Sequence, residues 1–195
     1  MRRSHKRAFG FTLIELMVTI AIAAILLTVA VPSFTTYLRN AELTSASNNL
    51  IATINTARGE AMKRNRRTMV VPTSNGTDWT TGWVVFVDLN GNNSYDSATD
   101  LTVTTKTALP SYLSVTGTGS ANDPTAPYIM FDASGYAAVV GGGFGGLTLS
   151  ISRNDVTGSQ LVNETRRIKI GRTGRVRSCK PVSATDAQCS TSSTD

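Results

Sequence analysis

Residues 11–31 have the sequence FTLIELMVTIAIAAILLTVAV, in which Glu15 is the only ionisable side chain. At the rise of an α-helix, a segment of this length spans about 30 Å, which matches the hydrocarbon core of a bilayer. Beyond Pro32 the composition becomes that of an ordinary mixed sequence. The 195-residue chain therefore predicts one membrane-spanning helix and about one globular domain after it.

The flank that precedes this segment is basic. It holds Arg2, Arg3, Lys6 and Arg7, and without them the formal charge of +6 falls to a mildly basic balance. Basic flanks stay on the cytoplasmic side of a membrane, so the rest of the chain is expected outside the cytoplasm.

The chain has two cysteines, Cys179 and Cys189, which lie close together near the C-terminus. An exported compartment permits them to form a disulfide. Two unrelated free thiols are the alternative.

The junction between the basic flank and the apolar segment carries a second signal. Thr28-Val29-Ala30 fits loosely the small-residue site after which an ordinary secretory signal is cut. The other end fits better: Arg7-Ala8-Phe9-Gly10 followed by Phe11-Thr12-Leu13-Ile14-Glu15 resembles the class III prepilin signal of type IV pilins. The resemblance implies that a membrane-bound prepilin peptidase cuts after Gly10 and that Phe11 becomes a methylated N-terminus, with the helix retained.

Glu15 is a functional candidate, because an unpaired carboxylate near the end of a spanning helix costs a few kcal/mol. Cleavage before Phe11 creates an α-amine four residues away that can neutralise it. In pilins this pairing is made with a neighbouring subunit, which implies a role for Glu15 in filament assembly. A tolerated glutamate at the membrane interface is the alternative.

The apolar pattern continues beyond the membrane segment. Pro32 is expected to kink the helix rather than end it. Apolar side chains then recur at spacings of three and four, which predicts an amphipathic helix to about Asn65. They are Phe34, Tyr37, Leu38, Ala41, Leu50, Ile51, Ile54, Ala57 and Ala61.

From Thr68 onward short β-type runs alternate with Gly, Asn, Asp and Pro. They predict antiparallel sheet packed on the second half of the long helix, an α+β arrangement. The resemblance at the N-terminus implies that this arrangement is the one of type IV pilins. The expected strands are 68–73, 83–88, 101–106, 128–132, 136–140, 147–152, 166–170 and 175–179. The expected parts are a cleaved leader (1–10), a membrane and assembly segment (11–32), an amphipathic helix (33–66), a β domain (67–180) and a tail with the disulfide loop (181–195).

Two stretches of the β region carry a further family resemblance. Gly82-Trp83-Val84-Val85-Phe86-Val87-Asp88 and Phe131-Asp132-Ala133-Ser134-Gly135 resemble the minor pilins and pseudopilins of the FimT, FimU and GspH group. With the N-terminus, the resemblance touches most of the chain. Gly141–Gly146 is expected to be a flexible connection, since no Lys, Ser/Thr cap or helix follows it as a phosphate loop requires.

No residue set points to catalysis or to a cofactor. The only histidine, His5, lies in the predicted leader, which leaves no Ser-His or Cys-His pair and no histidine metal ligand. The Asp88–Asp96 stretch has oxygen ligands at alternating positions, but Asn93 and Thr99 stand where an EF-hand has Gly and Glu. A β-turn is the preferred interpretation and calcium the alternative. We expect neither an enzyme nor a metal protein.

The segment 166–180 is strongly basic and contains no acidic residue. If residues 172–174 form a hairpin loop with Gly174 left-handed, Lys169 faces Arg177 and Val176 joins the isoleucine side. The outer face then gathers Arg167, Lys169, Arg175 and Arg177. Like charges opposite one another destabilise a sheet, so a polyanionic partner is expected.

Gly174-Arg175-Val176-Arg177 also matches the GRxR motif of FimT-type minor pilins, which implies capture of double-stranded DNA for natural transformation. The expected DNA-binding residues are Arg175, Arg177, Arg172, Lys169, Arg167 and Lys180. A solvated strand or a contact with neighbouring subunits is the alternative. A second basic group, Arg58, Lys63, Arg64, Arg66 and Arg67, is expected mainly to cap the long helix, or else to extend the DNA path.

The sequence therefore predicts a minor type IV pilin that joins a pilus and holds extracellular DNA without reading its sequence. The main alternative is a minor pilin or type II secretion pseudopilin that only primes or caps filament assembly. An exported enzyme is a third class, for which no reactive centre is visible. The expected partners are other pilins, the prepilin peptidase, DNA, and the inner membrane before assembly. The expected location is a single-pass inner-membrane protein with its domain in the periplasm, which then enters an extracellular pilus or a periplasmic pseudopilus.

Overall fold

The computed structural model describes residues 11–73 and 76–192, except for the side chains of Val29 and Pro32. The predicted leader, with the cleavage residue Gly10, lies outside the described residues. The chain forms two compact units, one up to Ala41 and one from Glu42 onward.

The N-terminal unit is the first part of helix α1, which extends over Leu13–Arg64. Its apolar side chains are exposed all around the helix, and by length and composition this part can cross a membrane. The helix begins with a capping box, in which Glu15 Oε2 accepts from Thr12 N at 3.3 Å and Thr12 Oγ1 accepts from Glu15 N at 3.3 Å. It continues through Pro32, so the proline does not end it; the kink stays a prediction.

The second part of α1 belongs to the globular unit and ends close to the predicted position. Asn65 adopts φ 54° and Arg66 N donates to Ala61 O at 3.2 Å, which is a Schellman-type end. The buried face runs through Leu43, Leu50, Ile54, Ala57 and Ala61, all fully buried.

The periodicity predicted that Phe34, Tyr37 and Leu38 would join that buried face. In the structure they remain exposed. The hydrophobic core begins at Leu43. The apolar side chains that recur at the same spacing before Leu43 are part of the exposed apolar segment. Periodicity therefore identified the helix correctly but not where its covered face begins.

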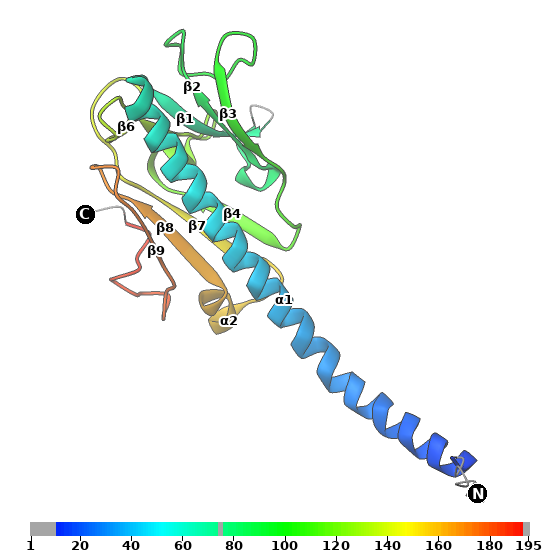
Figure 1. Ribbon diagram of the computed structural model, residues 1–195. Coiled ribbons are helices and arrows are strands. Elements are labelled where there is room, and N and C mark those ends of the chain that lie inside the picture. The colour runs from blue at the N-terminus through cyan, green and yellow to red at the C-terminus, as the bar shows by residue number, and fades with distance from the viewer. Residues whose placement is uncertain (1–10, 74–75, 193–195) are drawn as a thin grey trace, which may run out of the picture. The chain divides into compact units, whose positions relative to one another are not determined.

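The globular unit contains two antiparallel sheets that share one core with α1 (Figure 1). The first has the order β3-β2-β1-β5-β6 and the second the order β4-β7-β8-β9. Sheet one comprises β1 Thr68–Pro72, β2 Trp83–Val87, β3 Leu101–Lys106, β5 Ile129–Phe131 and β6 Ala137–Ala138. Sheet two comprises β4 Leu113–Gly117, β7 Leu147–Arg153, β8 Thr165–Ile170 and β9 Val176–Cys179. Short helices are η2 Trp79–Thr81, η3 Gly119–Asn122 and α2 Gly158–Asn163.

Inward-facing side chains of both sheets meet the buried stripe of α1. Val85 and Phe131 come from the first sheet, and Leu149 and Ile168 from the second, all fully buried. The predicted α+β arrangement, a long helix packed on antiparallel sheet, is therefore confirmed. Strand β4 and helix α2 were not predicted.

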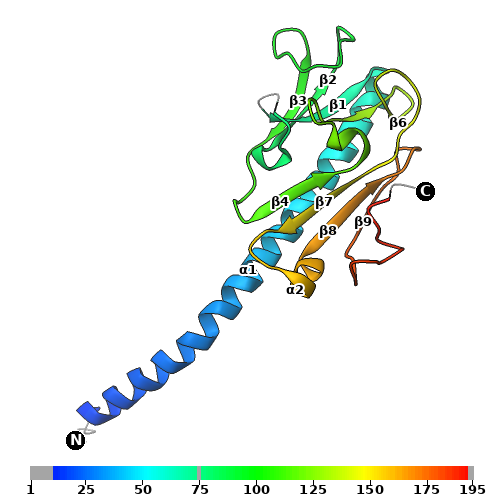
Figure 2. The ribbon, with the colours of Figure 1, turned by 180° about the vertical axis from the view of Figure 1, so that it is seen from behind.

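Strand β9 forms the edge of the second sheet, as both views of the ribbon show (Figures 1 and 2). Beside it the C-terminal segment is tied back by the Cys179–Cys189 disulfide, whose Cα atoms lie 5.8 Å apart. The predicted pairing of the two cysteines is thus present, and they are the two cysteines of the sequence.

Candidate functional site

The hairpin of β8 and β9 has the predicted register. Lys169 pairs with Arg177 and Ile170 with Val176, while Gly171 N donates to Arg175 O at 2.9 Å. Gly174 adopts φ 76°, the left-handed conformation on which that register depends. The turn therefore sends Arg175 and Arg177 to one face of the edge strand.

Exposure divides the six predicted DNA-binding residues into two groups. Arg172, Arg175, Arg177 and Lys180 are exposed. Among residues 11–73 and 76–192, no carboxylate forms an ion pair with Arg172, Arg175 or Lys180. We call these four residues the basic edge.

The prediction that Arg167 and Lys169 belong to the same solvent-facing stripe is wrong. Lys169 is only 3% exposed, and its partner Thr148 across the sheet is also buried. Arg167 is half-buried, and its Nη1 donates to the carbonyl oxygen of Cys189 in the disulfide loop. Alternation along a strand gives the face of a side chain but not what covers that face.

The disulfide loop is held by hydrogen bonds to the carboxylate of Asp186. This carboxylate accepts from Val182 N at 3.1 Å, Gln188 N at 2.9 Å and Cys189 N at 3.2 Å. The backbone N–H of Val182, followed by that of Cys189, holds the pKa of Asp186 below its ordinary value, and the nearby Arg167 adds to this. The loop is therefore braced beside the basic edge.

The turn between β8 and β9 is held from the other side by Arg58 of α1. Arg58 Nε donates to Gly135 O at 2.9 Å, and Nη2 donates to Thr173 O at 3.3 Å. A Cβ on Gly174 would lie 1.9 Å from the same Gly135 carbonyl. The role of Arg58 as a tether was missed, because the sequence does not reveal which carbonyls a helical arginine meets.

The other members of the second basic group also have local partners. Arg64 Nε lies 2.5 Å from Glu60 Oε2, and the hydrogen bond from Arg64 lowers the pKa of Glu60. Arg66 and Arg67 donate to Leu89 O at 3.5 Å and to Asn93 Oδ1 at 3.2 Å. These contacts join the end of the helix to Glu60 and to the loop after β2, and the capping role stays a prediction.

The Asp88–Asp96 stretch folds as a series of side-chain-to-backbone turns. Asp88 is 3% exposed and its carboxylate accepts from Gly91 N at 2.7 Å and Asn93 N at 3.1 Å. Asp96 accepts from Ala98 N at 2.9 Å. These are Asx-turn bonds, in which a carboxylate accepts from the backbone that follows it, and they agree with the turn interpretation of the sequence. In the described part of the chain, no three His, Cys, Asp or Glu side chains form a metal-binding group.

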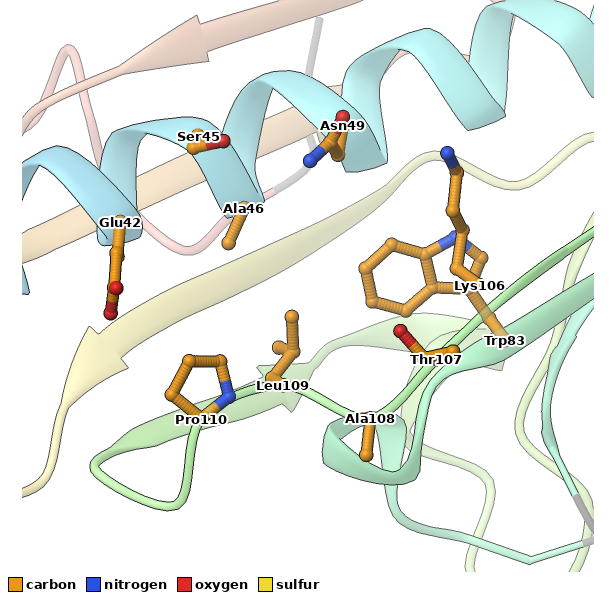
Figure 3. Close-up of a pocket in the computed structure, with 10 residues that line it drawn as sticks. All are labelled: Glu42, Ser45, Ala46, Asn49, Trp83, Lys106, Thr107, Ala108, Leu109 and Pro110. Atoms are coloured by element: carbon orange, nitrogen blue, oxygen red, sulfur yellow. The ribbon is translucent and has the colours of Figure 1, made fainter.

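A cavity of about 310 Å³ lies between α1 and the connection from β3 to β4 (Figure 3). Its wall includes the indole of Trp83, whose Nε1 donates to Thr53 Oγ1 at 3.2 Å. Glu42 and Lys106 bring one charge of each sign, and the ten lining residues include neither His nor Cys.

Comparison with known proteins agrees with this architecture. Residues 46–174 match the family described as type II transport protein GspH, and residues 5–31 match the prokaryotic N-terminal methylation motif. A search of curated proteins finds no significant match.

Two crystal forms of one solved protein show the same fold at low sequence identity. One crystal form of the type IV minor pilin FimU from Pseudomonas aeruginosa is 20% identical with a TM-score of 0.52, covering 73% of this chain and 96% of that one. A second form is 19% identical with a TM-score of 0.51, covering 72% and 99%. The minor pseudopilin EpsH from the type II secretion system of Vibrio cholerae is 16% identical with a TM-score of 0.49, covering 73% and 96%.

The family match spans about two thirds of the chain, and the methylation motif and the apolar helix fit a pilin with a single membrane anchor. The chain therefore belongs to the GspH family of type IV minor pilins and pseudopilins.

Proposed function

We propose that this chain is a minor type IV pilin that is built into a pilus and binds extracellular double-stranded DNA, without sequence preference, for natural transformation. The observation that carries the proposal is the basic edge. Four exposed cations lie on one turn and its edge strand, in a segment from 166 to 180 that contains no acidic residue. Guanidinium groups match phosphate oxygens in shape and charge, and such contacts attract DNA irrespective of its sequence.

The proposed role in the filament rests on the N-terminus. Prepilin peptidase would cut after Gly10, and the amine of Phe11 would pair with Glu15 of a neighbouring pilin. In the monomer Glu15 binds Thr12 in the capping box, and Phe11 is 86% exposed. The domain would lie in the periplasm before assembly and outside the cell afterwards.

We infer a binding role rather than a catalytic one. The single histidine of the sequence lies in the predicted leader. Among the interior hydroxyls, that of Thr53 accepts a hydrogen bond from Trp83 Nε1, which is a packing and orienting role.

The direct test measures DNA binding by the domain that begins after residue 38. This domain contains the whole hydrophobic core, whose first member is Leu43. A fluorescence titration with a labelled duplex at two salt concentrations should give an affinity that falls steeply with salt. Replacing Arg175 and Arg177 by Gln should flatten the logarithmic salt slope by about one unit for each lost phosphate contact.

A matched control for the single Arg175→Gln variant is Lys106→Gln, which removes one exposed positive charge outside both basic groups. It should lower the affinity much less than Arg175→Gln. The absence of salt-dependent binding by the wild-type domain would reject the DNA proposal.

The second candidate function is a pseudopilin or minor pilin that only primes or caps a filament. The observation that favours it is the extent of the family match, which ends at Gly174 and leaves Arg175 and Arg177 outside. Under this alternative the basic edge contacts neighbouring subunits, and the double variant would impair filament assembly while the purified domain shows no DNA binding.

A further inference from the structure

Two exposed aromatic rings lie together near the basic edge. Tyr136 is 43% exposed and Phe144 is 54% exposed, and their ring centroids are 5.2 Å apart with a 45° angle between the planes. Phe86, Phe131 and the two tryptophans of the domain are buried, and its other tyrosines are partly buried. An exposed aromatic pair on a domain with a complete core indicates a contact surface.

Backbone hydrogen bonds place this pair beside the turn that carries Arg172. Ala137 N donates to Arg172 O at 3.0 Å, and Gly145 N donates to Ala137 O at 3.1 Å. The yellow connection between β6 and β7 and the orange β8–β9 turn accordingly lie side by side in both views (Figures 1 and 2). Tyr136 directly precedes Ala137 in the chain, and Phe144 directly precedes Gly145, so each aromatic residue adjoins a residue that makes one of these hydrogen bonds.

The backbone beneath the pair is fixed. Tyr136 N donates to Asp132 Oδ1 at 2.9 Å, and Asp132 N donates to Tyr136 O at 3.0 Å. Gly135 accepts the bond from Arg58 that also holds the β8–β9 turn. The aromatic rings and Arg172 are therefore positioned by the same set of contacts.

The segment that carries the pair is uncharged, and the β8–β9 segment that adjoins it is cationic. Residues 133–150 and 166–180 contain no acidic side chain. The nearest carboxylate in sequence, Asp132, also accepts from Ser134 N at 2.9 Å. A ligand on this surface must therefore combine flat apolar faces with negative charge.

We propose that Tyr136 and Phe144 form a stacking platform for the bases of a single-stranded polynucleotide whose phosphates contact Arg172 and Arg175. In a duplex the bases are stacked inside and cannot reach the rings, whereas an unpaired strand exposes them. Aromatic platforms next to a positive groove are the common design of proteins that bind single strands without reading sequence. The phosphate contacts rest on the proposed DNA-binding function; the platform adds a preference for unpaired strands and ends.

The test compares two labelled probes of equal length, an oligothymidylate of about 20 nucleotides and a duplex, on the domain that begins after residue 38. The Phe144→Leu and Tyr136→Leu variants keep apolar bulk but lose the π-face. Each should weaken single-strand binding at least about fivefold and duplex binding less than about twofold. Leu161→Ala is the control, because Leu161 is an exposed apolar residue of α2, at the opposite end of β8 from the turn.

A Phe144→Trp variant keeps the ring and reports stacking directly. The native Trp79 and Trp83 are 2% and 1% exposed, so they give a constant background. Quenching of the new indole by the single strand but not by the duplex is expected. This variant keeps the test valid if a leucine variant loosens the β6–β7 connection.

The outcomes separate the two proposals. If the wild-type domain binds neither probe, the DNA-binding function fails. If it binds both probes and the leucine variants change neither, or change both equally, the DNA-binding function stands and the stacking platform is rejected. Loss of filament assembly with unchanged single-strand binding also rejects the platform and assigns the pair to a contact with another pilin.

Discussion

The guanidinium group of Arg58 holds the carbonyl of Gly135 through a 2.9 Å hydrogen bond from Nε, across 77 positions of sequence. Its Nη2 reaches Thr173 O as well, at 3.3 Å. One side chain of α1 therefore joins the turn after β5 to the turn between β8 and β9. This places the tether on the turn that carries Arg172.

Replacing Arg58 by Ala should destabilise the domain by about 1–3 kcal/mol, because hydrogen bonds from a charged donor are lost and two carbonyls lose their partner. Arg58→Lys should recover only part of this, since an ammonium lacks the planar fork that serves both acceptors. Urea denaturation measures both values. Arg64→Ala is the control, with an expected loss below about 1 kcal/mol for an exposed ion pair with Glu60. Equal losses for Arg58→Ala and Arg64→Ala would contradict the tether.

Gly174→Ala should be strongly destabilising and should disrupt the β8–β9 turn. The residue adopts φ 76°, and a Cβ would lie 1.9 Å from Gly135 O. Gly142 is the matched control, because it adopts φ 102° with nothing within 4 Å of an added Cβ. Gly142→Ala should cost only the conformational term of about 1–2 kcal/mol. Thermal melts of the two variants that coincide would show that the close approach to Gly135 is unimportant.

The fold was largely predictable, because its elements follow simple periods. The long helix was expected to end near Asn65 and ends at Arg64, and strands such as Trp83–Val87 and Leu101–Lys106 fall where β-branched and aromatic residues cluster. Strand β4 was missed because Leu113–Gly117 has only two large apolar side chains in alternation. It is paired along its length with β7, and such a long-range partner is not visible in a local pattern.

For the candidate site, the strand register could be predicted from the sequence, but the burial of its side chains could not. The predicted register, in which Lys169 pairs with Arg177, depended only on a three-residue loop and a left-handed glycine. Both are present in the structure. The burial of Lys169 depends on what lies over the sheet, which no strand pattern contains. The aromatic pair of Tyr136 and Phe144 likewise arises from a turn and a glycine-rich connection that meet only in the folded chain.

Lys180 and Lys169 should behave differently in DNA binding, although both belong to the basic segment. Lys180→Gln should reduce the logarithmic salt slope by about 0.9, the value for one phosphate contact with duplex DNA. Lys169→Met should leave the slope unchanged, because a side chain that is 3% exposed cannot reach a phosphate. Titrations over a range of salt concentrations measure the slopes. A loss of slope in the Lys169 variant equal to that in the Lys180 variant would contradict the division of the segment.

Removal of the disulfide should lower the free energy of unfolding by about 2–3 kcal/mol, from the entropy of closing a loop with a sequence separation of 10. The Cys179→Ser/Cys189→Ser variant tests this by urea denaturation. Cys189 is buried and its carbonyl accepts from Arg167, so β9 should also lose protection from amide exchange. A reductant should reproduce the effect in the wild type and change nothing in the serine variant.

Acid should loosen the disulfide loop through Asp186. The folded loop lowers the pKa of this carboxyl below its ordinary value of 3.8, chiefly through the backbone N–H of Val182 and then that of Cys189. The fold therefore favours the ionised form of Asp186. Its contribution to the stability of the loop is complete above pH 3.8 and is lost as the pH falls through the lower pKa of the folded state.

Protection factors of the Val182 and Cys189 amides should accordingly stay constant from neutral pH to about pH 4 and fall below it. In Asp186→Asn they should be low at every pH, since the neutral amide oxygen is a weaker acceptor than the carboxylate. Asp123 supplies the control, because its pKa is also lowered, by the backbone N–H of Ala126 first, in a turn outside this loop. Asp123→Asn should leave the Val182 and Cys189 protection unchanged. A decline in wild-type protection that begins well above pH 4 would assign the acid sensitivity of the loop to a group other than Asp186.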